Sequence, residues 1–273
     1  MATISEKMEL FKNNSVVNWH EHVWMTKDEN GKNVLNMDEL HGLIQGADDN
    51  YMDTLVCSLP ITRGVATPEM CREANDFVYE AMQLYPGRIL GMCYVDPGFG
   101  QEAVAEIERC VKELGMIGLK LYNQYTLDDP VQRPVLAKCA ELDIPVLIHA
   151  GYSIQCSADQ PNMSHSEQIA RAAKAFPDLT ILMAHVTGGG DWLWQLRGIV
   201  DCPNVLTDIS GSVVDLGAVE ETVKYLGADR VVFGTDGSIN GGVAKTLGAQ
   251  ISEQDKIKIL AGVGLRRFLK EAK

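Results

Sequence analysis

Histidine and aspartate side chains, which bind metal ions and carry protons, stand at the ends of several short apolar runs in this chain. His20 and His22 are separated by one residue in NWHEH. His149 ends the run IPVLIH, His185 follows LTILMA, and Asp236 follows VVFGT. Because these residues share one kind of position, the pattern predicts a metal centre if the fold brings the run ends together.

The apolar runs themselves are predicted to be β-strands. Several are continuous rather than alternating, which is typical of strands that are covered on both faces, as in parallel sheets wrapped by helices. Helical patterns separate them; for example, Pro68 stands where a first-turn proline belongs, and Pro86 and Gly87 end that helix. The eight predicted strands cover residues 16–19, 54–59, 88–95, 117–122, 144–149, 180–185, 205–209 and 230–234.

Eight strand–helix units in 273 residues predict an α/β fold, one closed (β/α)8 TIM barrel that forms a single domain over residues 1–273. Ile4, Met8 and Phe11 fall at helical spacing and predict a short N-terminal helix. The alternative is a doubly wound open sheet. Its dinucleotide-binding version is disfavoured, because the first strand is followed by WHEHVWM and not by a glycine-rich turn.

In a barrel, the carboxyl ends of the strands meet at one mouth, so the separated histidines and Asp236 are expected to lie together. Residues i and i+2 of a strand share a face, so His20 and His22 are expected to point inward while Glu21 points away. The predicted metal ligands are His20, His22, His149 and Asp236. Neutral imidazoles with one carboxylate favour Zn²⁺, and Mn²⁺ is possible with the same ligands.

Composition restricts the partners. The net charge is -13, so counterion release offers no gain on a phosphate backbone and nucleic acid is not expected as a partner. The amino-terminal segment has no secretory signal, and no apolar run is long enough for a membrane span. The seven cysteines are widely spaced with no CxxC pair, which favours reduced thiols and a cytoplasmic location.

Seven stretches span nearly the whole chain and are NWHEH, GLKLY, IPVLIHAG, FPDLTILMAHVTGGG, NVLTDIS, RVVFGTDGS and KILAGVGLRRFL. Taken in this order, they resemble the amidohydrolase superfamily, specifically its amidohydrolase-2 group. That group includes amino-carboxymuconate-semialdehyde decarboxylase, related aromatic-acid decarboxylases and pyrone-dicarboxylate lactonase. Asn18 stands where the group usually has Asp.

The resemblance implies the same four metal ligands and adds roles for two further residues. His185 resembles the sixth-strand histidine, which polarises the substrate or shuttles protons in one-metal members. Lys120 stands on the fourth strand, where two-metal members carry a bridging lysine, but in the amidohydrolase-2 group it does not bridge metals. The expectation is therefore one divalent metal ion.

The leading hypothesis is a metal-dependent hydrolase of a small amide, lactone or ester. In it a metal-activated water attacks, Asp236 accepts the proton, and His185 polarises the carbonyl. One alternative is a metal-dependent non-oxidative decarboxylase or hydratase of a small carboxylated substrate, in which His185 protonates carbon. Another alternative is a non-catalytic binding protein on the same barrel.

Substrate contacts are expected from Arg63, Lys120 and Tyr152. Arg63 follows the second strand at the predicted mouth and is suited to pairing with a substrate carboxylate. Lys120 can supply positive charge there, and Tyr152 can form part of the pocket wall. A homodimer is possible through the tryptophans at 192 and 194.

Overall fold

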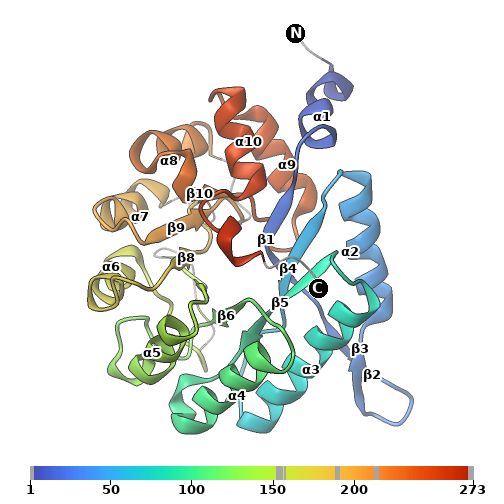
Figure 1. Ribbon diagram of the computed structural model, residues 1–273, viewed down its shortest axis with the longest axis vertical. Helices are drawn as coiled ribbons and strands as arrows, with labels where there is room; N and C mark the ends of the chain where they lie inside the picture. The colour runs from blue at the N-terminus through green and yellow to red at the C-terminus, as the bar shows by residue number, and fades with distance from the viewer. Residues whose placement is uncertain (1–2, 152–155, 157, 188–190, 212–214, 270–273) are drawn as a thin grey trace.

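The computed structural model describes residues 3–151, 156, 158–187, 191–211 and 215–269. Eight parallel strands form one sheet in the order in which they follow each other from β1 to β10, and helices surround this sheet (Figure 1). The strands of this sheet are β1 (Val17–His22), β4 (Thr54–Ser58), β5 (Ile89–Tyr94), β6 (Gly118–Leu121), β7 (Val146–Ile148), β8 (Ile181–Met183), β9 (Val205–Asp208) and β10 (Val231–Val232).

Backbone hydrogen bonds between β1 and the segment after β10 join the two ends of the sheet. Trp19 N donates to Phe233 O over 2.9 Å, and Asp236 N donates to His20 O over 2.7 Å. The architecture is therefore the predicted (β/α)8 barrel. All eight predicted strands are present, although β7 and β8 end before His149 and His185, which belong to the turns that follow. A single domain over the whole chain stays a prediction.

Helices follow the barrel strands and cover their outer faces (Figure 1). Pro68 opens α3, as the sequence predicted, and the Thr67 side chain caps this helix. In the described part of the chain the helices are α1 (Ile4–Lys12), α2 (Met37–Asp49), α3 (Pro68–Leu84), α4 (Gln101–Lys112), α5 (Arg133–Glu141), α6 (Ser166–Ala175), α7 (Trp192–Ile199), α8 (Ala218–Leu226), α9 (Ile239–Gly248) and α10 (Glu253–Ala261). Single 3₁₀ turns are η1 (Pro97–Phe99), η2 (Pro130–Gln132), η3 (Ala228–Arg230) and η4 (Arg266–Phe268).

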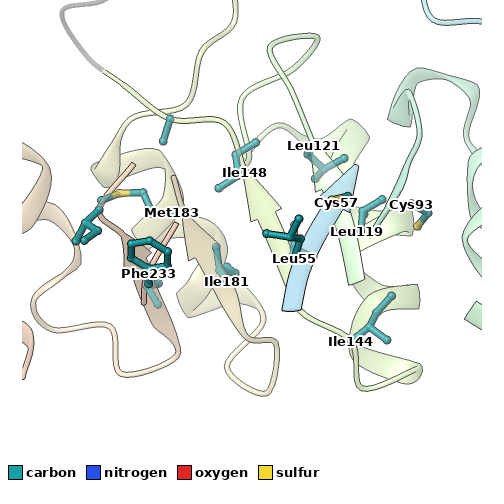
Figure 2. Packing of buried hydrophobic residues seen from close by; sticks show 14 of the residues in the cluster. Leu55, Cys57, Cys93, Leu119, Leu121, Ile144, Ile148, Ile181, Met183 and Phe233 are labelled. Atoms are coloured by element: carbon teal, nitrogen blue, oxygen red, sulfur yellow. The ribbon is translucent and has the colours of Figure 1, made fainter. Parts of the chain in front are cut away.

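The hydrophobic core has two parts, one on each side of the barrel wall. The larger part lies between the strands and the helices, and Figure 2 shows Leu119, Ile148 and Ile181 among its residues. The smaller part includes Val56, Leu147 and Leu182, whose neighbours in each strand belong to the larger part. Since successive strand residues point to opposite faces, these residues fill the inside of the barrel.

One element was not predicted. An antiparallel hairpin of β2 (Met25–Lys27) and β3 (Asn33–Leu35) is inserted between β1 and α2, and all three residues of β2 are exposed. The N-terminal helix α1 was predicted. Its one buried residue, Phe11, packs edge-on against Phe233 with ring centroids 5.7 Å apart.

Candidate active site

A bulge in β1 sets the direction of both of its histidines. The register pairs Asn18 with Leu55 and then Glu21 with Cys57, so two residues of β1 face Val56 alone. Trp19 and His20 are those two residues. Because of the bulge, Trp19 can fill the inside of the barrel while His20 and His22 still point to its mouth.

His20, His22 and Asp236 form a compact group of possible metal ligands. One donor atom from each lies within 4.8 Å of the others. His22 Nε2 is 2.9 Å from Asp236 Oδ1, and His20 Nε2 is 3.6 Å from the same oxygen. Burial alone would raise the pKa of Asp236, but the hydrogen bond from His22 and the nearby His20 and His185 hold this pKa well below its usual range. The carboxylate is therefore ionised and suited to a cation.

The far nitrogen of each histidine is held by a different partner. His20 Nδ1 is 2.8 Å from Asp208 Oδ2, and both side chains are fully buried. His22 Nδ1 lies 3.2 Å from Ser58 O and 3.1 Å from Ser58 Oγ. In metal sites such partners hold the proton on one ring nitrogen and leave the other free for the ion. The donor set and its partners thus fit a divalent metal.

Asp208, at the end of β9, links His20 to the predicted proton carrier. Its Oδ1 accepts hydrogen bonds from the His185 backbone N–H at 2.9 Å and from Ser210 Oγ at 2.5 Å. Ser210 Oγ in turn lies 2.8 Å from His185 Nδ1. Since the serine proton points at Asp208, the oxygen is left to accept the proton of His185 Nδ1. Asp208 was not among the predicted site residues.

His185 and His149 face one another across the mouth. His185 Nε2 is 3.0 Å from His149 Nδ1, and the ring centroids are 4.7 Å apart in an edge-on arrangement. Burial lowers the pKa of His185 and holds that of His149 well below its usual range. His185 Nε2 also lies 3.6 Å from Asp236 Oδ2. Among the described residues, two groups of three could hold a metal ion: His20, His22 and Asp236, and also His20, His185 and Asp208. His149 is outside both groups, so its role as a ligand stays a prediction.

Lys120 is fully buried in the middle of the site. Its Nζ lies 2.8 Å from His20 Nε2. Burial lowers the pKa of Lys120 to about 8, against the opposing charges of Asp236 and Asp208. His20 Nδ1 carries the proton toward Asp208, so His20 Nε2 offers a lone pair to Lys120. A metal would use that same lone pair, so the Lys120 contact and metal ligation by His20 Nε2 exclude each other.

The turns that carry His185 and Asp236 have left-handed backbone conformations. The φ angles are +62° at His185 and +47° at Asp236, a region that residues other than glycine rarely adopt. Such strain persists only where surrounding contacts fix it. Here Asp208 holds the His185 N–H, and Asp236 N donates to His20 O. The chain thus bends sharply at two of the predicted site residues.

Glu21 lies between the two histidines of β1 and points away from them, as expected, but its side chain is buried and not solvated. Its carboxylate accepts hydrogen bonds from Thr235 Oγ1, from Asn18 Nδ2 at 3.2 Å and from Gly237 N at 3.1 Å. Burial raises the pKa of Glu21 despite these contacts. The carboxylate thus accepts from the Thr235 hydroxyl on one side of Asp236 and from the Gly237 backbone N–H on the other, and so supports the turn that carries Asp236.

The three predicted substrate-binding residues do not lie together in the structure. Lys120 lies inside the site. Arg63 is exposed in the loop after β4, where Gln160 Nε2 donates to Ile61 O and Gly64 O, each over 3.0 Å. Tyr152 lies outside the described residues. Tyr122, which follows β6, packs on His149 with ring centroids 4.3 Å apart.

The amidohydrolase family model matches residues 17–262, which is most of the chain. The protein therefore belongs to the amidohydrolase superfamily and to its amidohydrolase-2 group. It is an enzyme of the amidohydrolase fold.

Two similar proteins have names that specify a reaction. The gamma-resorcylate decarboxylase of Polaromonas sp. strain JS666 is 25% identical over 268 residues, which cover 78% of this chain and 82% of that protein. The 2-keto-4-carboxy-3-hexenedioate hydratase of a Sphingobium species is 27% identical over 165 residues, with 51% and 47% covered.

A solved structure with the same fold is the dihydroxybenzoic acid decarboxylase of Polaromonas sp. JS666, which holds manganese and the inhibitor 2-nitroresorcinol. Its TM-score is 0.70 at 22% identity, with 93% of this chain and 97% of that chain covered.

These similarities overturn the leading expectation of a hydrolase. The similar proteins include decarboxylases of resorcylate and carboxyvanillate as well as hydratases, which matches the alternative. The physical reason for the error is that a metal beside a proton-carrying imidazole can serve both kinds of reaction.

In the described part of the chain, no helix combines the length and apolar character that crossing a membrane requires.

Proposed function

We propose that the protein is a divalent-metal-dependent, non-oxidative decarboxylase of a small carboxylic acid. The single observation that carries the proposal is the position of His185. His185 Nε2 lies 3.6 Å from Asp236 Oδ2, the carboxylate oxygen of a proposed metal ligand. His185 Nδ1 is held by Ser210 Oγ, which in turn donates to Asp208. The decarboxylase relatives support this class of reaction over hydrolysis.

His20, His22 and Asp236 would hold the metal, with His149 as the fourth predicted ligand. When bound, the ion supplies positive charge that neutralises and orients the substrate carboxylate or an adjacent oxygen. Histidine and carboxylate ligands suit both manganese and zinc. Manganese is the ion found in the Polaromonas decarboxylase structure, and we propose it ahead of zinc, which has no support beyond the ligand types.

His185 would deliver the proton. With Nδ1 donating to Ser210 Oγ, Nε2 is the nitrogen that can carry a proton toward the substrate. Burial lowers the pKa of His185, and the negative charge of a bound carboxylate opposes that shift. A π-electron pair of the substrate takes the proton at the carbon that bears the carboxylate, and the electrons of the broken Nε2–H bond stay on the imidazole. The bond to the carboxylate carbon then breaks, its electron pair restores the π system of the substrate, and CO2 leaves.

The substrate class is a hydroxylated aromatic acid or an unsaturated acid, because the carbon that bears the carboxylate must offer a π-electron pair to the incoming proton. The Polaromonas relative acts on gamma-resorcylate, an acid of this kind. Lys120 would give up its contact with His20 Nε2 when the metal binds and would add positive charge within the site. Carboxylate pairing by Arg63, a pocket wall that includes Tyr152, and a homodimer remain predictions.

The test uses purified protein loaded with manganese or zinc and a panel of hydroxybenzoates and carboxylated dienoates in D2O. We expect one CO2 for each product and one deuterium at the carbon that lost the carboxylate. Changing His185→Gln should lower the rate about 10²- to 10⁴-fold with metal content unchanged. Product formed by addition of water without CO2 would support the hydratase instead. No turnover of any substrate by metal-loaded protein would refute the proposal.

A further inference from the structure

A lysine outside the metal site lies directly behind the turns that carry His185 and Ser210. Lys245 belongs to α9 and is only 7% exposed. Its Nζ donates to Gly211 O at 2.7 Å, Thr187 Oγ1 at 3.0 Å and Ile209 O at 3.2 Å. These three oxygens occupy all three donors of an ammonium group.

The three acceptors belong to the two turns of interest. Thr187 follows His185 by two residues after β8, while Ile209 and Gly211 flank Ser210 after β9. The Thr187 hydroxyl also lies 2.9 Å from Ile209 O and 3.1 Å from Ser210 O. The ammonium and this hydroxyl therefore join the turn after β8 to the turn after β9.

A buried lysine is costly unless its donors are used, because its charge loses hydration. Burial lowers the pKa of Lys245, and Asp208 and Asp215 oppose that effect. An apolar side chain would fill the same space without this cost. A lysine at this position therefore indicates a need for its three directed hydrogen bonds.

We propose that Lys245 is a positioning residue for His185. It fixes Ser210 relative to His185, so that Ser210 Oγ stays 2.8 Å from His185 Nδ1 and the imidazole keeps one tautomer and one direction. Lys245 contacts none of the proposed metal ligands and acts only through the two turns. The expected effect on turnover rests on the proposed decarboxylation, while the effect on the imidazole does not.

The experiment compares Lys245→Met and Lys245→Arg with the wild type. The matched control is Lys256→Met, which removes another partly buried ammonium whose Nζ donates to one carbonyl, Leu247 O, at 3.0 Å. We expect Lys245→Met to lower kcat about tenfold with little change in KM. Lys245→Arg should recover part of the loss, because it keeps the charge and donors. Lys256→Met should leave both constants unchanged.

A second measurement does not depend on turnover. In metal-free protein labelled with ¹⁵N-histidine, the His185 ring signals report the tautomer and the protected Nδ1 proton; a His185→Gln spectrum assigns them. We expect Lys245→Met to shift these signals and to speed exchange of that proton, whereas Lys256→Met should not. If the wild type turns over no acid, the proposed function fails, but this spectrum still tests Lys245.

Unchanged His185 signals together with wild-type kcat in folded Lys245→Met would overturn the proposal. If Lys245→Met does not fold, Thr187→Val removes the bridging hydroxyl and nearly preserves side-chain shape. A shifted His185 signal in Thr187→Val would then support the role of the turn-to-turn contact, and an unaltered one would refute it.

Discussion

The inside of the barrel has two layers that are equally buried and chemically opposite. The layer nearer the amino ends of the strands is apolar and includes Leu147 and Leu182, each at most 1% exposed. The layer nearer the carboxyl ends contains His20, Lys120 and Asp208, each fully buried. In the second layer His20 lies 2.8 Å from both Asp208 and Lys120. The difference teaches that, within one closed sheet, packing at one end can stabilise the fold while polar side chains at the other end form the reactive site.

The largest expected effect breaks the apolar layer. Changing Leu182→Ala removes a buried side chain and leaves a cavity, so the free energy of unfolding should fall by about 2–5 kcal/mol. Because Leu182 contributes only packing, metal affinity should stay unchanged. Urea unfolding and metal titration check the two parts. Leu182→Met, which nearly conserves volume, is the control and should cost less than about 1.5 kcal/mol. A metal affinity that falls with stability would show that the layers are not separate.

The next effect breaks the polar layer. Asp208→Asn keeps the shape but removes the charge 2.8 Å from His20 Nδ1, so metal affinity should fall about 10- to 100-fold. Competition with a chelating dye measures it. Thermal unfolding of the metal-free variant shows whether the fold is kept. An affinity equal to that of the wild type would exclude Asp208 as the partner that orients His20.

Lowering the pH should destabilise the metal-free protein through the polar layer and not through the apolar layer. Burial lowers the pKa of His20 to about 3, with Lys120 acting in the same direction against Asp208. Below about pH 6.5 the unfolded chain binds a proton at this residue and the folded protein does not. The free energy of unfolding should therefore fall by about 1.4 kcal/mol per pH unit from this residue as pH drops toward 3.

The readout of this acid effect is the slope of unfolding free energy against pH, with a chelator present. His20→Gln should have a shallower slope than the wild type, whatever its absolute stability. Leu182→Ala should keep the full slope because it changes no titrating group. Parallel slopes for the wild type and His20→Gln would contradict the expected neutral state of His20.

The smallest effect compares the two histidine partners. Ser58→Ala removes one hydroxyl 3.1 Å from His22 Nδ1 and leaves Ser58 O at 3.2 Å. A single neutral hydrogen bond contributes about 1 kcal/mol, so metal affinity should fall less than about fivefold. The same dye competition applies. A loss as large as that of Asp208→Asn would mean that His22 depends on its partner as much as His20 does.

The strands were predictable because their physical cause is local. Runs such as IPVLIH are apolar at every position, since both faces of β7 are covered. The bulge at Trp19 was not predictable, because it depends on pairing with Val56 in another strand. The β2–β3 hairpin was missed for a similar reason: its strands are three residues long, and β2 has no buried face.

The site was predictable in its residue types and less so in its connections. His20, His22 and Asp236 could be grouped because parallel strands place their carboxyl ends together. Asp208 ends a strand in NVLTDIS and offered the same signal, but its partner His20 is 188 residues away. The reaction was predicted wrongly, because ligand types specify a metal and a proton carrier but not the bond that breaks.

The seam between β1 and the segment after β10 has a consequence for the order of folding. The Asn18–Thr235 hydrogen bond joins residues 217 positions apart, and the same seam contains the Asp236 N–H bond to His20 O. Contacts so distant along the chain carry a large loop-closure cost and tend to form late. We therefore expect the metal ligands to assemble only when the last strand joins the first. Partly folded chains would then lack the complete ligand group, and recovered metal binding during refolding would mark completion of the barrel.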